Sequence, residues 1–89
     1  MTRKGKSVIR ETLNRIKWHE KPDRYIIRIL HRSLDGEIGF IEIRASDIDE
    51  IGSWYIRLGG TIIPFHRIVE IRRTNGEIVW RKGYRDATF

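Results

Sequence analysis

The 89-residue chain contains no cysteine, one methionine and two prolines. Without cysteine, disulfide frameworks, thiolate catalysis and cysteine-ligated zinc or iron–sulfur centres are excluded. No apolar run approaches the roughly 20 residues needed to cross a bilayer, and the basic N-terminus lacks the apolar core of a signal peptide. We therefore expect a soluble, cytoplasmic protein.

Candidate catalytic groups are equally sparse. The sequence has no P-loop, no G-x-G-x-x-G after a predicted strand, no G-x-S-x-G and no H-E-x-x-H. Its carboxylates mostly accompany arginines on predicted surface strands, and none forms an isolated couple in apolar surroundings. Its three histidines lack the clustered spacing of a zinc site, and His19 is expected to cap the carbonyl end of a helix. The sequence therefore predicts a protein that is not an enzyme and that needs no metal or cofactor.

Positive charge is what the chain has in excess. Lys and Arg number 18 against 12 Asp and Glu, so the formal net charge is +6 and the isoelectric point is about 10.2. This balance favours partners that carry phosphate. A chain of this size buries only about 60–65% of its unfolded surface. We therefore expect one domain with a modest core and no large internal substrate cavity.

Apolar periodicity predicts one helix and then a series of strands. Ile9, Leu13 and Ile16 recur at i, i+4 and i+7 on one face of a helix over residues 7–18, and Pro22 disfavours its continuation. A single helical turn is expected at residues 46–51. Strands are expected at residues 25–32, 39–44, 54–58, 61–63, 68–73 and 77–82.

The strand at residues 25–32 is apolar on both faces, so we expect it to be central and covered by the helix. An Asp-Gly pair at residues 35–36 turns the chain into the next strand. A two-residue turn would place Ile41 beside Leu30, whereas a bulge would swap that register. The sequence leaves both registers open.

An Asn-Gly pair at residues 75–76 favours a type I′ turn that would place Ile71 opposite Trp80. Together the elements define an α+β fold, in which the N-terminal helix packs on a strongly bent antiparallel sheet or small barrel of five to six short strands. The expected organisation is a flexible basic arm (residues 1–6), a single domain (residues 7–82) and a polar tail (residues 83–89).

Two histidine–arginine pairs, His31-Arg32 and His66-Arg67, lie near the ends of predicted strands. Arginine offers a planar fork to phosphate oxygens and histidine adds a donor, so the pairs indicate a phosphate site if the fold brings them together. The pattern H-x-[ST], which two-histidine phosphoesterases carry twice, occurs once, at residues 31–33. One copy argues against that catalytic family, although a ribonuclease-like pair of imidazoles stays open.

Arginines and aromatic residues interleave on the predicted outer faces. Single-stranded nucleic acid is often held in this way, with bases on aromatic rings and phosphates on arginine. Trp54 is expected to fill the core, as is Trp80, because small domains use large aromatics in their interiors. The interleaved pairs are Phe40 with Arg44, Tyr55 with Arg57 and Trp80 with Arg81.

Four segments carry a family resemblance. They are Leu13-Asn14-Arg15-Ile16-Lys17-Trp18-His19, the His31-Arg32 pair after a tyrosine-initiated strand, Ile63-Pro64-Phe65-His66-Arg67-Ile68 and Asn75-Gly76-Glu77-Ile78-Val79-Trp80. Over about residues 9–82 the chain thereby resembles a small archaeal family, the RNA cyclic-group end recognition domain. Its eukaryotic members look like domains joined to RNA-processing partners. The resemblance implies non-catalytic binding of RNA ends that bear a 2′,3′-cyclic phosphate.

The family's histidine–arginine positions correspond to the two pairs in this chain. The chain departs from the family at Ser33, where glycine is common, and at Phe65, where tyrosine is common, so that a hydroxyl donor is lost. We expect the arginines to clamp the phosphate oxygens, the histidines to donate hydrogen bonds and an aromatic ring to stack the terminal base. The expected site comprises His31, Arg32, His66 and Arg67, with Tyr55, Phe65, Arg57 and Arg44 for stacking or backbone contact.

The expected partner is therefore a single-stranded RNA 3′ end, with an RNA-processing protein as a possible second partner. No membrane contact is expected, and the protein should be a monomer or a weak dimer. Two alternatives stay open. One is a protein-interaction module whose basic face meets an acidic partner, and the other is a cyclic phosphodiesterase that uses His31 and His66 as an acid–base pair.

Overall fold

The structure, a computed structural model, describes residues 5–82, with side chains from residue 8 onward. The predictions for residues 1–4 and 83–89 lie outside this part. Helix α1 begins two residues before its predicted start, so residues 5 and 6 belong to the helix and not to the basic arm. The described residues form α1 (Gly5–His19), β1 (Tyr25–Arg32), β2 (Ile38–Arg44), β3 (Glu50–Ile51), β4 (Tyr55–Leu58), β5 (Thr61–Pro64), β6 (Ile68–Arg73), β7 (Ile78–Arg81) and the 3₁₀ turns η1 (Pro22–Arg24), η2 (Ala45–Asp47) and η3 (Phe65–Arg67).

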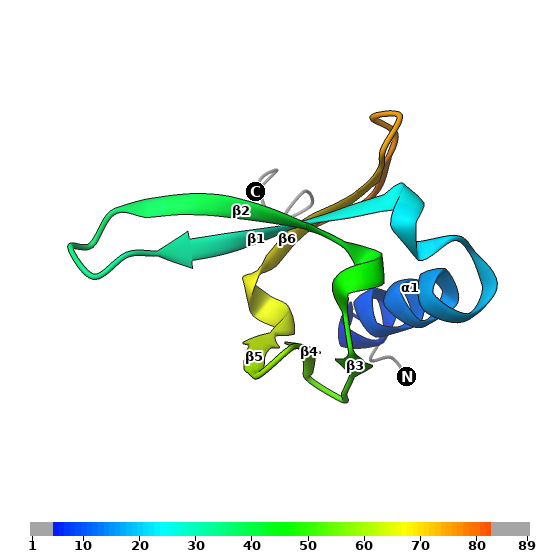
Figure 1. The fold of residues 1–89 in the computed structure, drawn as a ribbon, viewed down its shortest axis with the longest axis horizontal. Helices are drawn as coiled ribbons and strands as arrows, with labels where there is room; N and C mark the ends of the chain where they lie inside the picture. Colours follow the sequence, from blue (N-terminus) through cyan, green and yellow to red (C-terminus); the bar gives the residue numbers. More distant parts are fainter. Residues whose placement is uncertain (1–4, 83–89) are drawn as a thin grey trace.

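The strands form two antiparallel sheets, a four-stranded sheet in the order β2-β1-β6-β7 and a three-stranded sheet in the order β3-β4-β5 (Figure 1). The predicted α+β class and the central place of β1 are confirmed. The barrel alternative is wrong, because within residues 5–82 the sheets do not close on each other. The turns η2 and η3 redirect the chain from one sheet to the other, which is why the strands do not form one bent sheet.

The hydrophobic core lies between α1 and the inner faces of the sheets. Ile9, Leu13 and Ile16 are buried, which confirms the predicted helical stripe. Across the four-stranded sheet, Ile27 pairs with both Ile43 and Ile71, and Trp80 extends this row. Burial of each such isoleucine contributes about 1.5–3 kcal/mol relative to exposure. The core is therefore concentrated where the helix covers this row.

The second hairpin reaches its predicted register by an unexpected route. Gly76 has a positive φ of 101° and Asn75 does not, so the predicted type I′ turn is wrong; Gly76 instead follows a type I turn in a three-residue loop. Val79 is an extra, bulged residue between the pairs Arg72–Ile78 and Ile71–Trp80. The bulge offsets the longer loop, so the predicted pairing of Ile71 with Trp80 is confirmed.

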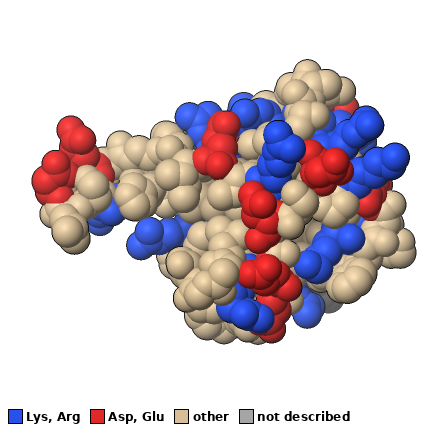
Figure 2. Space-filling view, viewed as in Figure 1, with Lys and Arg blue, Asp and Glu red and all other residues tan. Residues whose placement is uncertain are grey.

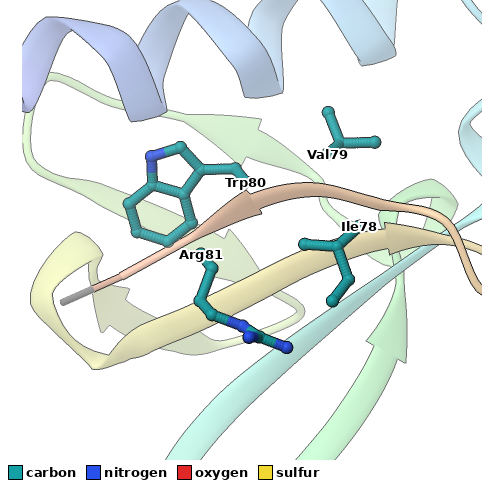
Figure 3. Close-up of a pocket in the computed structure, with 4 residues that line it drawn as sticks. All are labelled: Ile78, Val79, Trp80 and Arg81. Carbon is teal, nitrogen blue, oxygen red and sulfur yellow. The ribbon is translucent and has the colours of Figure 1, made fainter. Parts of the chain in front are cut away.

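The bulge also sorts the side chains of β7. Val79 and Trp80 both pack against the core, and Figure 3 shows Trp80 and Arg81 on opposite sides of the strand. Trp80 is therefore partly buried against the core, which confirms the predicted side of the strand but not full burial. A pocket of about 330 Å³ beside this strand is lined by residues 78–81.

The first hairpin adopts the bulged alternative that the sequence left open. Ile41 lies opposite Ile29, and Phe40 lies opposite Leu30. Gly36, with a φ of 92°, closes the same kind of three-residue loop as in the second hairpin. The pKa of Asp35 in this loop is lowered, because Ser33 donates a hydrogen bond of 2.5 Å to its carboxylate.

Two predictions on the smaller sheet need correction. Residues 46–51 do not form one helical turn: η2 ends at Asp47, and the backbone of Asp49 and Gly52 then bonds to β4, which makes a short strand. Trp54 is 57% exposed and not part of the core, because it stands in the turn before β4. No helix within residues 5–82 is long and apolar enough to cross a membrane.

Charged side chains cover the outer face of the four-stranded sheet. Glu70 is only 9% exposed, and its carboxylate lies 3.1 Å from Arg72 and 3.4 Å from Arg81. Arg72 also reaches Glu42, at 3.0 Å. The Arg72 guanidinium of β6 thus pairs with Glu70 of its own strand and with Glu42 of β2, and so links β6 to β2 across β1.

This bridge predicts loss of stability in acid. Arg72 donates a hydrogen bond that lowers the pKa of Glu42 from its ordinary 4.5. Because the folded pKa is below the unfolded one, this contribution is full above pH 4.5 and is lost as the pH falls through the folded value. Thermal melts between about pH 7 and pH 3 should show a smaller acid-induced fall for Glu42→Gln than for the wild type. An identical fall in both proteins would contradict the assignment.

The β1–β2 hairpin extends beyond the rest of the four-stranded sheet. Strand β6 pairs with β1 only as far as Ile29, so residues 30–40 project as a two-stranded hairpin arm (Figure 1). Leu34 at its tip and Ile38 beside it are exposed. The arm stands over β5 and η3, and this arrangement creates the cleft described next.

Candidate functional site

A cleft of about 550 Å³ lies between the hairpin arm and the segment formed by β5 and η3. On the side of the arm, it is lined by residues 29–31 of β1 and by Ile41 of β2. On the other side it is lined by residues 61–64 and by His66 and Arg67. Three of the four predicted phosphate-binding residues therefore line one cleft.

The fourth residue, Arg32, does not line this cleft. Successive side chains along a strand point to opposite faces. Tyr25, Ile27 and Ile29 are buried on the inner face, and by this alternation His31 follows them while Arg32 lies on the other side of the strand. Arg32 and His31 together line a depression at the hairpin turn. His31 thus belongs to both hollows and Arg32 to the depression alone, and a joint action of the pair on one phosphate stays a prediction.

His66 and Arg67 escape this alternation because they lie in a 3₁₀ turn and not in a strand. Buried residues fix the turn on both sides: Phe65 is 8% exposed and Ile68 is fully buried. The Phe65 amide donates to the carbonyl of Trp54 at 2.8 Å, and the Lys82 ammonium donates to the carbonyl of His66. The anchored turn thus presents two adjacent cationic or polar side chains to the same cleft.

The cleft favours an anion. Among the residues that line it, none is acidic. Within residues 5–82, Arg67 makes no ion pair with a carboxylate. Figure 2 shows Lys and Arg interspersed with Asp and Glu over the body, whereas the projecting arm carries acidic side chains at its end and is largely uncharged between that end and the body. An anion in the cleft would therefore meet Arg67 without a competing carboxylate in the lining.

Thr61 is a lining residue that the sequence analysis did not single out. It offers a hydroxyl at the start of β5, directly after the Gly59-Gly60 turn. The sequence carries one sign of this role: Thr61 directly follows the Gly59-Gly60 turn, and the first residue of a strand after a tight turn lies at the rim of the sheet.

Two of the remaining predicted residues lie near the cleft but are already engaged. Tyr55 pairs with Pro64 across β4 and β5, and Arg57 pairs with Ile62. The Tyr55 hydroxyl donates to Glu50 at 3.3 Å, and Arg57 forms an ion pair with the same carboxylate at 3.0 Å. Tyr55 also packs edge-on against Trp54, with ring centroids 4.8 Å apart. A ligand could therefore contact Tyr55 and Arg57 only through the parts of these side chains that Glu50 and Trp54 do not occupy.

Phe65 and Arg44 are not placed to contact a ligand in the cleft. Phe65 belongs to the hydrophobic core, because its burial holds η3 in place, and its ring offers no free face to a base. Arg44 pairs with Ile26 on the outer face of the four-stranded sheet. His19 is exposed at the end of α1 and does not line the cleft. Within the described chain, no three His, Asp or Glu side chains gather as a metal site would require.

Comparison with known proteins identifies the family. The profile of the MJ1316 RNA cyclic group end recognition domain matches residues 7–82, which is most of the chain. The chain belongs to this family. The match includes every strand of both sheets and all the residues that line the cleft.

Similar curated proteins come from archaea and are named UPF0248 proteins. One from Archaeoglobus fulgidus is 42% identical over 71 residues, which are 79% of this chain and 99% of the relative. One from Pyrococcus abyssi is 38% identical over 77 residues, which are 84% of this chain and 89% of the relative. One from Saccharolobus solfataricus is 38% identical over 80 residues, which are 84% and 96%. No solved structure matches.

Proposed function

We propose that the chain is a non-catalytic RNA-binding module that recognises RNA ends carrying a 2′,3′-cyclic phosphate, in RNA processing or repair. The observation that carries the proposal is the cleft that His31, His66 and Arg67 share, in a member of a family described as a recognition domain for RNA cyclic group ends. Arg67 would grip the two free phosphate oxygens, and the imidazoles would donate hydrogen bonds.

The composition of the cleft supports a cyclic over an open phosphate. Four isoleucines, at positions 29, 41, 62 and 63, form much of its walls. A cyclic phosphate carries one negative charge, whereas an open 3′-phosphate carries nearly two near neutral pH and loses more hydration on entering apolar surroundings. The monoanion is thus the better match for one arginine between isoleucine walls.

The test compares RNAs of one sequence that end in a cyclic phosphate, a 3′-phosphate or a free hydroxyl. We expect the cyclic end to bind at least about tenfold more tightly than the hydroxyl end, because each hydrogen bond to a charged group contributes about 1.5–3 kcal/mol. Fluorescence anisotropy with the full chain measures all three affinities. Equal affinities would remove end recognition and leave only general RNA binding.

The two imidazoles also support a second candidate, an RNA cyclic phosphodiesterase. His31 and His66 line the same cleft from opposite sides, as an acid–base pair must. The enzyme would hydrolyse the cyclic phosphate: one imidazole takes a proton from the attacking water, whose oxygen bonds to phosphorus, and the other protonates the ribose oxygen that leaves. The rate would show a bell-shaped dependence on pH. Incubation of the cyclic-end RNA followed by chromatography separates the candidates: an intact end supports recognition, and an opened end supports catalysis.

The protein-interaction alternative has its own observation, the exposed Leu34 and Ile38 of the hairpin arm. They would add an apolar contact to the basic face that, in this alternative, meets an acidic protein partner. Failure to bind any RNA at low salt would favour this alternative over the RNA-binding proposal.

A further inference from the structure

A second pocket lies on the outer face of the four-stranded sheet and shares no lining residue with the cleft. It has a volume of about 320 Å³. Three of its residues are cations and one is an acid. The lining of this outer pocket is Arg28, Phe40, Val69, Glu70, Arg81 and Lys82.

Arg28 stands between two carboxylates and bonds to neither. On β1 it is in register with Glu42 of β2 on one side and with Glu70 of β6 on the other. Both carboxylates are taken by Arg72 from the neighbouring row, at 3.0 and 3.1 Å. The Arg28 guanidinium lies instead over the ring of Phe40, 4.4 Å from its centroid.

This arrangement leaves a donor unused. The Nε of Arg28 is buried and has no hydrogen-bond partner within residues 5–82. A buried N–H of a charged group costs free energy until an acceptor satisfies it. Within residues 5–82 neither Arg28 nor Lys82 forms an ion pair with a carboxylate. Glu70 already pairs with Arg72 and Arg81, so the two unpaired cations give the outer pocket a positive charge that favours an anion.

The outer pocket adjoins the cleft at two points. Leu30, which lines the cleft, is the register partner of Phe40, which lines the outer pocket. Lys82 lines the outer pocket, and its ammonium donates to the carbonyl of His66 in the cleft. An extended chain whose end lies in the cleft can therefore continue into the outer pocket around this edge of β1.

We propose that the outer pocket binds a phosphodiester of the same RNA strand, upstream of the end held in the cleft. The inference rests on the proposed function for the position of the RNA end. Arg28 would bind the phosphate through its guanidinium, with Arg81 and Lys82 beside it. Phe40 is 49% exposed, so its ring and the Arg28 guanidinium also offer a surface on which an RNA base can stack. An acidic peptide has no base to stack there, so this surface favours RNA as the ligand.

The test uses the full chain and two ligands that end in the same cyclic phosphate: a nucleoside 2′,3′-cyclic monophosphate, which has no upstream phosphodiester, and a ten-nucleotide RNA. Arg28→Gln should weaken binding of the longer RNA about tenfold, and should lower the slope of log affinity against log salt by about 0.7. Binding of the cyclic mononucleotide should not change. Arg81→Gln should act in the same direction about threefold, whereas Arg15→Gln, on the exposed side of α1, should have little effect.

Two results would overturn the outer pocket. One is unchanged binding of the longer RNA by both Arg28→Gln and Arg81→Gln, in variants whose circular dichroism melts show them folded. The other is competition by an acidic peptide as strong as by RNA of equal charge. Failure of the proposed function looks different: cyclic and hydroxyl ends would bind equally, while Arg28→Gln would still weaken the longer strand.

Discussion

Replacing Arg67 by alanine is expected to weaken binding of RNA with a cyclic phosphate end by about 10- to 100-fold, since hydrogen bonds to charged groups contribute about 1.5–3 kcal/mol. Arg67 is the arginine that lines the cleft, and no acid lines it to compete for the guanidinium. Binding of RNA with a hydroxyl end should fall much less. The variant should therefore lose discrimination between ends more than it loses general affinity.

Arg32→Ala is the matched control for this experiment. Arg32 also follows a histidine, but it does not line the cleft; it lines the depression at the hairpin turn. We expect less than about a threefold change in affinity, through the long-range effect of one exposed charge. Equal losses from both substitutions would mean that the two pairs act together and that the assignment of faces is incorrect.

Replacing Ile27 by alanine is expected to destabilise the fold by about 2–5 kcal/mol. Ile27 is fully buried, and it pairs with Ile43 and Ile71 at the centre of the four-stranded sheet. Domains of this kind have a total stability of about 5–15 kcal/mol. The melting temperature should therefore fall by at least about 10 °C.

Ile26→Ala removes the same atoms one position earlier on the opposite face of the strand. Ile26 is half-buried, between Arg44 and Arg72 in register. Its loss should cost about 1 kcal/mol. Thermal melts of the two variants under identical conditions compare the faces directly. A larger fall for Ile26→Ala would contradict the assignment of the core face.

The sequence predicted the elements whose periodicity is local. The stripe of Ile9, Leu13 and Ile16 located α1, and the apolar run at residues 25–32 gave the bounds of β1. The division into two sheets was not predictable in the same way. It depends on η2 and η3 and on the point where β6 leaves β1, which are set by contacts between distant segments.

The candidate site was predicted in part for an equally physical reason. The strand period places His31 and Arg32 on opposite sides of β1, whereas their adjacency in the sequence suggests that they act as a pair. Trp54 shows the converse limit, since its exposure follows from the point at which β4 begins and composition carries no sign of it. Arg28 was missed because its isolation between two acids appears only after three strands are in register.

The register of strand β1 determines both the side on which His31 lies and the burial of the apolar residues of the same strand. Shifting the strand by one position would bring Arg32 to the cleft, but it would also expose Tyr25, Ile27 and Ile29 to water. A register shift that turns the His31 imidazole away from the cleft would therefore also unfold the protein or make it aggregate. The protein cannot lose the orientation of this side chain through misregistration and still remain folded.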